Sequence, residues 1–126
     1  PFEDNTFDVS SISFGIRNVD NLDMALKELA RVTKPTGQVM ILEFGQVQWP
    51  VIKQAYNLYS NKILPWVGGL ISGEKDAYQY LNQSAQKFPC SNEFTQRAID
   101  TGSYTSMIYK ELSLGIAYIY KGTPAP

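Results

Sequence analysis

The chain of 126 residues contains no histidine and a single cysteine, Cys90. Without histidine it has no Ser-His or Cys-His nucleophile pair, no histidine general base and no histidine-ligated metal of its own. One cysteine can form neither an internal disulfide nor a zinc motif, and it fits a reducing compartment. We therefore expect no metal site and a cytoplasmic location.

Charge of either sign is nowhere concentrated. The 11 Lys and Arg residues nearly balance the 12 Asp and Glu residues, giving a formal net charge of -1. No basic run could neutralise a series of phosphates, so nucleic acid is not an expected partner. Because 44% of the residues are hydrophobic and 18% are charged, the composition favours one packed domain over disorder.

Long apolar runs are also absent. The longest in the middle of the chain, residues 63–71, contains Pro65 and is too short for a bilayer span of about 20 residues. The first residues, with Glu3 and Asp4, lack the basic and apolar regions of a signal peptide. Since the chain starts just before a predicted strand and without methionine, we interpret it as a fragment of a longer protein.

A strand–helix–strand unit is the clearest structural pattern. Residues 7–13 read as a strand, and a helix with apolar residues at helical spacing follows, capped by Asp20 or Asn21 and ended by Pro35. Residues 38–44 form a nearly continuous apolar run, typical of a strand buried on both faces. The order predicts a right-handed crossover and a parallel pair, which is an α/β arrangement.

Helices and a final hairpin follow that unit. The predicted ranges are Pro50–Ile63, Glu74–Phe88 and Ser91–Asp100 for helices, and Tyr104–Leu112 and Leu114–Lys121 for antiparallel strands. Pro65 should end the first helix before a loop at Gly68 and Gly69, and Ser91 should cap the third. The sequence thus predicts an open sheet whose last strand is antiparallel and whose unpaired edge invites association.

Three segments resemble motifs of one methyltransferase family. PFEDNTFD (1–8) is similar to the start of the fourth strand in class I methyltransferases, ISFGIRNV (12–19) resembles the signature that follows it in the UbiE-type family, and residues 31–44 resemble that family's second signature. Residues 55–81 follow the family's inserted helices. The family's glycine-rich loop and ribose-binding acidic residue have no match here.

The resemblance implies a particular fold and reaction. Residues 1–126 would be the C-terminal half of a Rossmann-like, S-adenosylmethionine (SAM)-dependent methyltransferase domain, without its N-terminal cofactor-binding half. The implied reaction is C-methylation of a polyprenyl benzoquinol or demethylmenaquinol in ubiquinone or menaquinone biosynthesis. We expect the fragment to be inactive alone and to pair with a second copy or with the missing half. The alternatives are a catalytically silent scaffold subunit of a quinone-synthesis complex, or another small-molecule methyltransferase.

The resemblance also implies site residues at the end of the first strand. Ser13 and Phe14 are expected to contact SAM. Arg17 and Asn18 are expected to be catalytic, with Arg17 stabilising the developing phenolate and Asn18 orienting it, since arginine stays protonated and is a poor base. Alternatively, Arg17 could be structural and pair with Asp20 or Asp23, and Ser13 could be an ordinary strand residue.

The inserted helices supply the expected substrate contacts. Tyr78 and Tyr80 cannot share one helix face, and Tyr78, on the apolar stripe, is the one expected to point inward. Tyr78 and Tyr59 are the predicted quinol-binding residues, with core packing as the alternative. An aromatic and aliphatic group could receive a polyprenyl tail or rest peripherally on a membrane, namely Tyr56, Tyr59, Trp66, Leu70 and Ile71. Glu43 is expected to order the loop after its strand.

Overall fold

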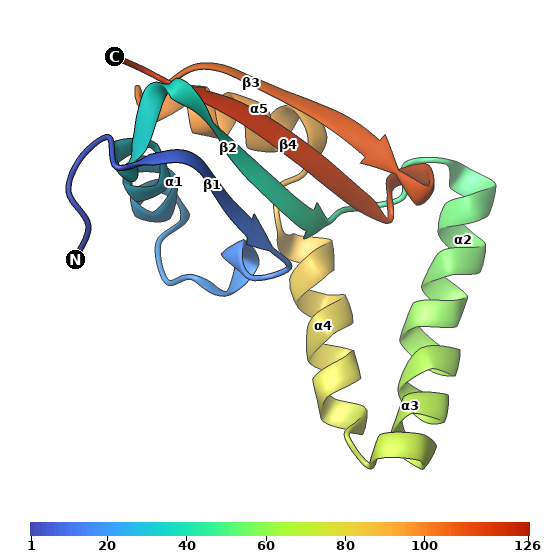
Figure 1. Ribbon diagram of the computed structural model, residues 1–126. Helices are drawn as coiled ribbons and strands as arrows, with labels where there is room; N and C mark the ends of the chain where they lie inside the picture. The colour runs from blue at the N-terminus through green and yellow to red at the C-terminus, as the bar shows by residue number, and fades with distance from the viewer.

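A computed structural model describes all residues, 1–126, and its centre is a four-stranded mixed sheet with the order β1-β2-β4-β3. The strands are β1 (Phe7–Ser13), β2 (Thr33–Phe44), β3 (Tyr104–Leu112) and β4 (Ala117–Pro124). β1 and β2 pair in parallel, whereas β4 pairs antiparallel with both β2 and β3 (Figure 1). The predicted parallel pair and antiparallel final hairpin are confirmed.

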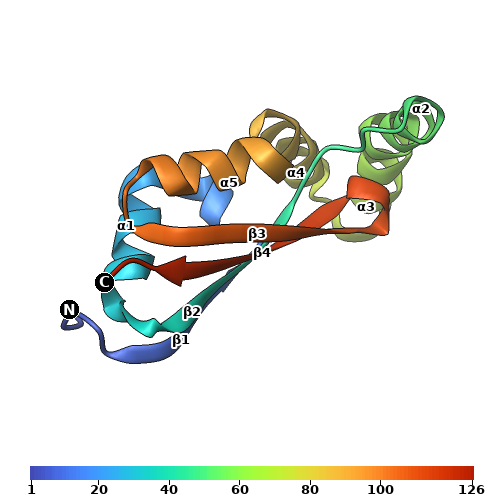
Figure 2. The same ribbon diagram turned by 90° about the horizontal axis from the view of Figure 1, so that it is seen from above.

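Two helices cover one face of this sheet. A single 3-10 turn, η1 (Ile16–Asn18), and α1 (Leu22–Val32) connect β1 to β2, and α5 (Ser91–Asp100) precedes β3. Seen from above, α1 and α5 lie on the same side of the sheet (Figure 2). The core lies between these layers, where Leu26, Ile41 and Phe94 are fully buried.

Helix caps agree with the sequence in part. The Asn21 side chain accepts a hydrogen bond from the Met24 N–H at 3.0 Å, so Asn21, and not Asp20, caps α1. The predicted Ser91 cap is wrong by one residue, because Cys90 is the N-cap of α5 and makes no side-chain cap bond. The Ser91 N–H instead donates to the Tyr120 hydroxyl on β4 at 3.0 Å. The N-terminus of α5 is therefore hydrogen-bonded by a side chain of β4, and not by the side chain of Ser91 as expected.

The prediction that β2 is buried on both faces is wrong. Val39 and Ile41 are fully buried beneath the helices, but the alternate residues Met40 and Leu42 are only partly covered. Residues 38–44 of β2 are apolar on both sides of the strand, yet the two helices that pack on the sheet, α1 and α5, lie on one face (Figure 2). β2 also begins at Thr33, earlier than predicted, through an irregular stretch opposite the start of β1.

A helical hairpin projects from the sheet (Figure 1). α2 (Pro50–Leu58), the π turn η2 (Tyr59–Ile63) and α3 (Leu64–Ser72) follow one another without a break, and α4 (Lys75–Lys87) returns to the sheet. Pro65 therefore does not end the helix, since the π turn directly before it absorbs the disturbance, with the Leu64 N–H donating to the Tyr59 carbonyl.

Gly68 and Gly69 lie inside α3 and not in a loop, so that prediction is also wrong. A Cβ on Gly68 would fall 2.5 Å from the Tyr78 ring, so the glycine allows α3 and α4 to approach closely. α3 ends at Gly73, whose φ of 75° is left-handed. None of the helices has the length and apolar character that crossing a bilayer requires.

Candidate active site

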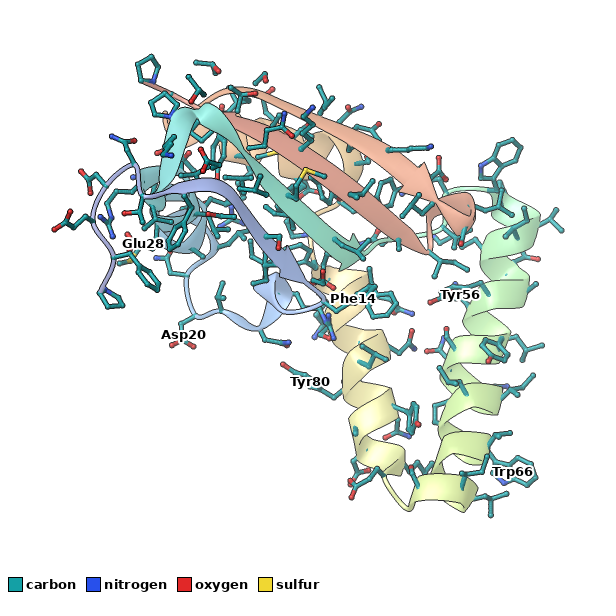
Figure 3. The ribbon with its side chains drawn as sticks, in the orientation of Figure 1. Phe14, Asp20, Glu28, Tyr56, Trp66 and Tyr80 are labelled. Atoms are coloured by element: carbon teal, nitrogen blue, oxygen red, sulfur yellow. The ribbon has the colours of Figure 1, made fainter.

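The predicted site residues meet at the carboxyl ends of the parallel strands. Phe14 directly follows β1, Glu43 is the next-to-last residue of β2, and η1 brings Arg17 between them. In open α/β sheets this end of the strands is where ligands bind. The first residues of α4 are far away, but Tyr80 near its middle (Figure 3) and Ser84 one turn later reach the residues at this edge.

Arg17 and Glu43 form a buried ion pair. The Arg17 Nη1 to Glu43 Oε1 distance is 2.6 Å, and the side chains are 7% and 0% exposed. The carboxylate also accepts hydrogen bonds from the backbone N–H groups of Arg17 at 3.3 Å and Phe44 at 2.9 Å. Because all these donors lie within the protein, the cost of burying the charge is offset without water.

The rest of the guanidinium is held as tightly. Nε of Arg17 donates to the Ser84 hydroxyl at 3.2 Å, and Nη1 donates to the Phe14 carbonyl at 2.9 Å. The Phe44 ring lies 5.4 Å from the guanidinium carbon, within the range of a cation–π contact. No hydrogen bond of the chain uses Nη2. The geometry thus fixes Arg17 and leaves Nη2 as its one uncommitted donor nitrogen.

The structural partner considered for Arg17 from the sequence was wrong. Asp23 pairs with Arg97 at 2.7 Å instead, and this contact holds the pKa of the Asp23 carboxyl below its usual value. Asp20 forms no ion pair. The sequence did contain a signal for Glu43, because an acidic residue inside an apolar strand needs a cationic partner if it is buried.

Asn18 contacts α4 and not the Arg17 guanidinium. Its Oδ1 accepts a hydrogen bond from the Tyr80 hydroxyl at 3.1 Å. Tyr80 is 59% exposed and points away from the hairpin interior toward η1 (Figure 3). The residues that orient Arg17 in the structure are Glu43, Ser84 and Phe14, so the expected orientation of Arg17 by Asn18 is not seen.

Ser13 and Phe14 remain accessible at the end of β1. The Ser13 side chain is exposed, and its hydroxyl takes part in no hydrogen bond within the chain. Phe14 has a φ of 54°, a left-handed conformation that costs roughly 1–3 kcal/mol for a non-glycine residue. Its N–H donates to the Leu42 carbonyl at 2.8 Å. The residue is 40% exposed, and the centroid of its ring lies 4.6 Å from that of the Phe44 ring, with the two planes tilted by 35°. A free hydroxyl and an accessible ring fit contact with a cofactor.

The two predicted quinol-binding tyrosines do not join this cluster. Tyr78 is half-buried against Gly68 between α3 and α4, as its place on the apolar stripe predicted. Tyr80, two positions later, reaches Asn18 instead, so the two side chains do occupy different faces. Tyr59 is 48% exposed in η2 and makes no hydrogen bond to the Arg17 cluster.

A cavity of about 190 Å³ lies beside the cluster, beyond the end of β2. Its walls come from the β2–α2 connection, α2 and α4, and its lining residues are Gly45, Gln46, Val47, Lys53, Tyr56, Asn57 and Gln86. Tyr56 points from α2 toward this space, and partial burial raises the pKa of its hydroxyl (Figure 3). The sequence had grouped Tyr56 only with the exposed aromatic residues of the hairpin.

Comparison with known proteins identifies the family of the chain. Residues 1–124 match a protein-family model described as the ubiE/COQ5 methyltransferase family. The chain is 56% identical over 122 residues to the ubiquinone/menaquinone biosynthesis C-methyltransferase UbiE of Bdellovibrio bacteriovorus, covering 97% of this chain and 52% of that protein. It is 46% identical to the mitochondrial 2-methoxy-6-polyprenyl-1,4-benzoquinol methylase of Dictyostelium discoideum, covering 97% of this chain and 38% of that protein.

Solved structures share the fold at low identity. A SAM-dependent methyltransferase of Thermotoga maritima, described as a possible histamine N-methyltransferase, superposes with a TM-score of 0.63 at 18% identity. The match covers 99% of this chain and 59% of that structure. The methyltransferase CalH, solved in complex with SAH, matches with a TM-score of 0.61 at 14% identity, covering 98% of this chain and 32% of CalH. The chain thus spans about half or less of the length of the curated relatives it matches.

Proposed function

The chain belongs to the ubiE/COQ5 methyltransferase family, and we propose that it supplies the substrate-side half of a SAM-dependent quinol C-methyltransferase domain. The relatives named above are quinone-biosynthesis C-methyltransferases, and both cover nearly all of this chain. The proposed substrate is a polyprenylated benzoquinol or naphthoquinol. The observation that carries the proposal is the position of Arg17, fixed by Glu43 and Ser84 at the carboxyl ends of β1 and β2.

The proposed chemistry gives each cluster residue a distinct task. When bound, SAM supplies an electrophilic methyl group for the quinol ring carbon. The ring becomes more nucleophilic as its phenol oxygen gains negative charge, and a fixed hydrogen-bond donor stabilises that charge. Arg17 would do so through Nη2, since its Nε and Nη1 already donate to Ser84, Phe14 and Glu43. Ser13 and Phe14 would contact the cofactor.

Asn18 and the tyrosines have secondary tasks in this proposal. Asn18 would position Tyr80 over the approach to Arg17, through the hydrogen bond between them. Tyr78 and Tyr59 remain the predicted substrate contacts of the hairpin, and Tyr56 joins them because it lines the cavity beside the cluster. A quinol ring entering from the hairpin side would meet these aromatic side chains before reaching the strand ends.

The chain matches only part of its UbiE relative, and this limits the activity that we propose for the chain alone. The match covers about half of the UbiE relative, so we infer that the chain alone does not hold a complete cofactor site. Pairing with a second copy or with the rest of the domain, and peripheral contact with a membrane, remain predictions. The alternative function is a catalytically silent subunit of a quinone-synthesis complex.

The test of the catalytic proposal is substitution of Arg17 in a chain that carries the complete methyltransferase domain. Arg17→Lys keeps a charge for Glu43 but loses the planar fork, and we expect kcat to fall by about 100-fold or more with a smaller change in KM. Arg97→Lys, in the exposed pair with Asp23, is the control and should leave kcat within about twofold. Full activity of Arg17→Lys would refute the proposed role.

Calorimetric titration of SAM into the 126-residue chain tests whether its cofactor site is incomplete. We expect no measurable heat of binding, because the cofactor site would be incomplete. Micromolar binding would show that this chain holds a self-contained site, and the half-domain proposal would then be wrong. No activity from the completed domain, with SAM bound, would favour the silent subunit.

A further inference from the structure

α3 turns its apolar side outward. Six residues at helical spacing form this outward stripe, and each is at least 38% exposed: Tyr59, Ile63, Trp66, Val67, Leu70 and Ile71. The opposite side of the helix carries the small or short residues Ser60, Pro65 and Gly68, which are buried. A helix of a water-soluble domain normally shows the reverse arrangement, with its apolar stripe toward the core.

The segment that carries the stripe has charged residues of only one sign. Residues 45–73 contain no Asp or Glu, although the chain has 12 such residues elsewhere. The only charged side chains of this segment are Lys53 and Lys62. Lys62 directly precedes Ile63 and so lies about 100° around the helix from it, at the margin of the stripe. Within this segment the stripe is flanked by a lysine and by no carboxylate, and Glu74 and Asp76 follow it at the start of α4. An apolar stripe with a lysine at its margin is complementary to an apolar layer with an anionic surface.

The aromatic residues fit the same surface. The chain has two tryptophans, Trp49 and Trp66, and they are 59% and 64% exposed at the start of α2 and on α3. Trp66 projects from the far end of the hairpin, away from the sheet (Figure 3). Tryptophan prefers the boundary between headgroups and acyl chains, because its ring is apolar and its N–H needs a polar partner.

We propose that the outward stripe of η2 and α3 lies on a lipid surface that carries anionic headgroups. The apolar side chains would enter the acyl boundary while Lys62 contacts the headgroups, as in other interfacial helices. A second copy of the chain is the less favourable occupant, since two-fold pairing of this segment would bring lysines together with no carboxylate from residues 45–73 between them.

The test uses the 126-residue chain and vesicles of phosphatidylcholine with or without phosphatidylglycerol. Co-sedimentation should be stronger with phosphatidylglycerol. In Trp49→Phe, where Trp66 is the only tryptophan, its emission should shift to shorter wavelength on vesicle addition. Leu70→Glu should weaken vesicle binding by roughly tenfold, whereas Ile108→Glu on β3, a similarly exposed position, should change it less than twofold.

Several outcomes would overturn the proposal. No sedimentation with either vesicle, or an equal loss in the Leu70→Glu and Ile108→Glu variants, would exclude the stripe as a lipid contact. Equal binding to both vesicle types would exclude the anionic preference. Light scattering that shows a dimer, converted to a monomer by Leu70→Glu, would assign the stripe to a second copy. Circular dichroism must match among all variants. None of these measurements depends on methyl transfer, so failure here leaves the proposed function standing.

Discussion

Two buried side chains organise the candidate site at the scale of single residues. Arg17 and Glu43 are separated by the whole of α1 in sequence, yet they meet at 2.6 Å because parallel strands end at one edge. We expect Glu43→Gln to lower the free energy of unfolding by about 3 kcal/mol, since it leaves the buried guanidinium without a charged partner. Urea denaturation followed by circular dichroism measures this change.

Glu28→Gln is the matched control for that substitution. Glu28 pairs with Arg31 at 2.6 Å, but its side chain is 56% exposed, so its loss should cost less than about 1 kcal/mol. Equal effects of the two substitutions would mean that the Arg17–Glu43 pair is effectively solvated. Arg17→Met combined with Glu43→Leu should recover part of the stability, because no unpaired charge then remains.

The site was predictable from the sequence only in part. The position of Arg17, Asn18, Ser13 and Phe14 at the end of β1 followed from the strand pattern and the family motif. The partner of Arg17 did not, because it depends on which residues of β2 lie beside β1, and spacing within one segment says nothing about that register. Ser84 was missed for the same reason, since it reaches the site from a helix far along the chain, and the contact of Tyr80 with Asn18 was not foreseen.

Cys90 provides a probe of the packed state. Its side chain is 7% exposed next to the core, and burial raises the pKa of its thiol. Thiolates react with disulfide reagents and neutral thiols do not, so Ellman's reagent should label the native chain slowly and the urea-unfolded chain fully. Fast labelling of the native chain would show that the α5 end of the core opens easily.

At the scale of elements, locally encoded features were predicted well. The bounds of β1 and β3 match those expected from the sequence, and Leu22, Leu26 and Ala30 form the buried face of α1. Other features of the helices and strands were predicted wrongly. Pro65 was read as a stop, but the preceding π turn carries the helix through it. β2 was predicted to be buried on both faces, but both helices that pack on the sheet lie on one face (Figure 2), and Met40 and Leu42 on the other are only partly covered.

The close approach of β1 and β2 gives a prediction at this scale. A Cβ on Gly37 would lie 2.4 Å from the Asp8 carbonyl oxygen, a backbone atom that can move only with β1. Gly37→Ala should therefore destabilise the chain by about 2 kcal/mol, a typical cost of overpacking. Thermal unfolding followed by circular dichroism measures the effect.

Gly15→Ala serves as the comparison. Its new methyl group would come no closer than 3.5 Å to Ile12, an ordinary contact, and its φ of -123° suits any residue. The change in stability should stay within about 0.5 kcal/mol. If Gly37→Ala were equally mild, β1 would have to shift freely along β2, and the register that places Glu43 of β2 beside Arg17 would be loosely fixed.

For the whole molecule, the three buried tyrosines between sheet and helices set a limit in alkaline solution. Burial raises the pKa of Tyr118 to about 12 from 10.0, and it also raises the pKa of Tyr104 and Tyr120. Below pH 10 these hydroxyls are neutral in both folded and unfolded chains, so they impose no penalty. Above it the unfolded chain loses protons that the folded chain keeps, and stability falls as pH rises from 10 toward 12.

Tyr118→Phe tests this linkage, because phenylalanine fills the same space without an ionisable group. The variant should lose less stability between pH 10 and 12 than the wild type, as measured by urea denaturation at each pH. Tyr80→Phe, at a 59% exposed position, should follow the wild-type curve. Parallel curves for all three proteins would mean that Tyr118 ionises in the folded state as easily as in water. The sheet–helix interface would then be open to solvent, and the fixed geometry of Arg17 at its edge would lose its support.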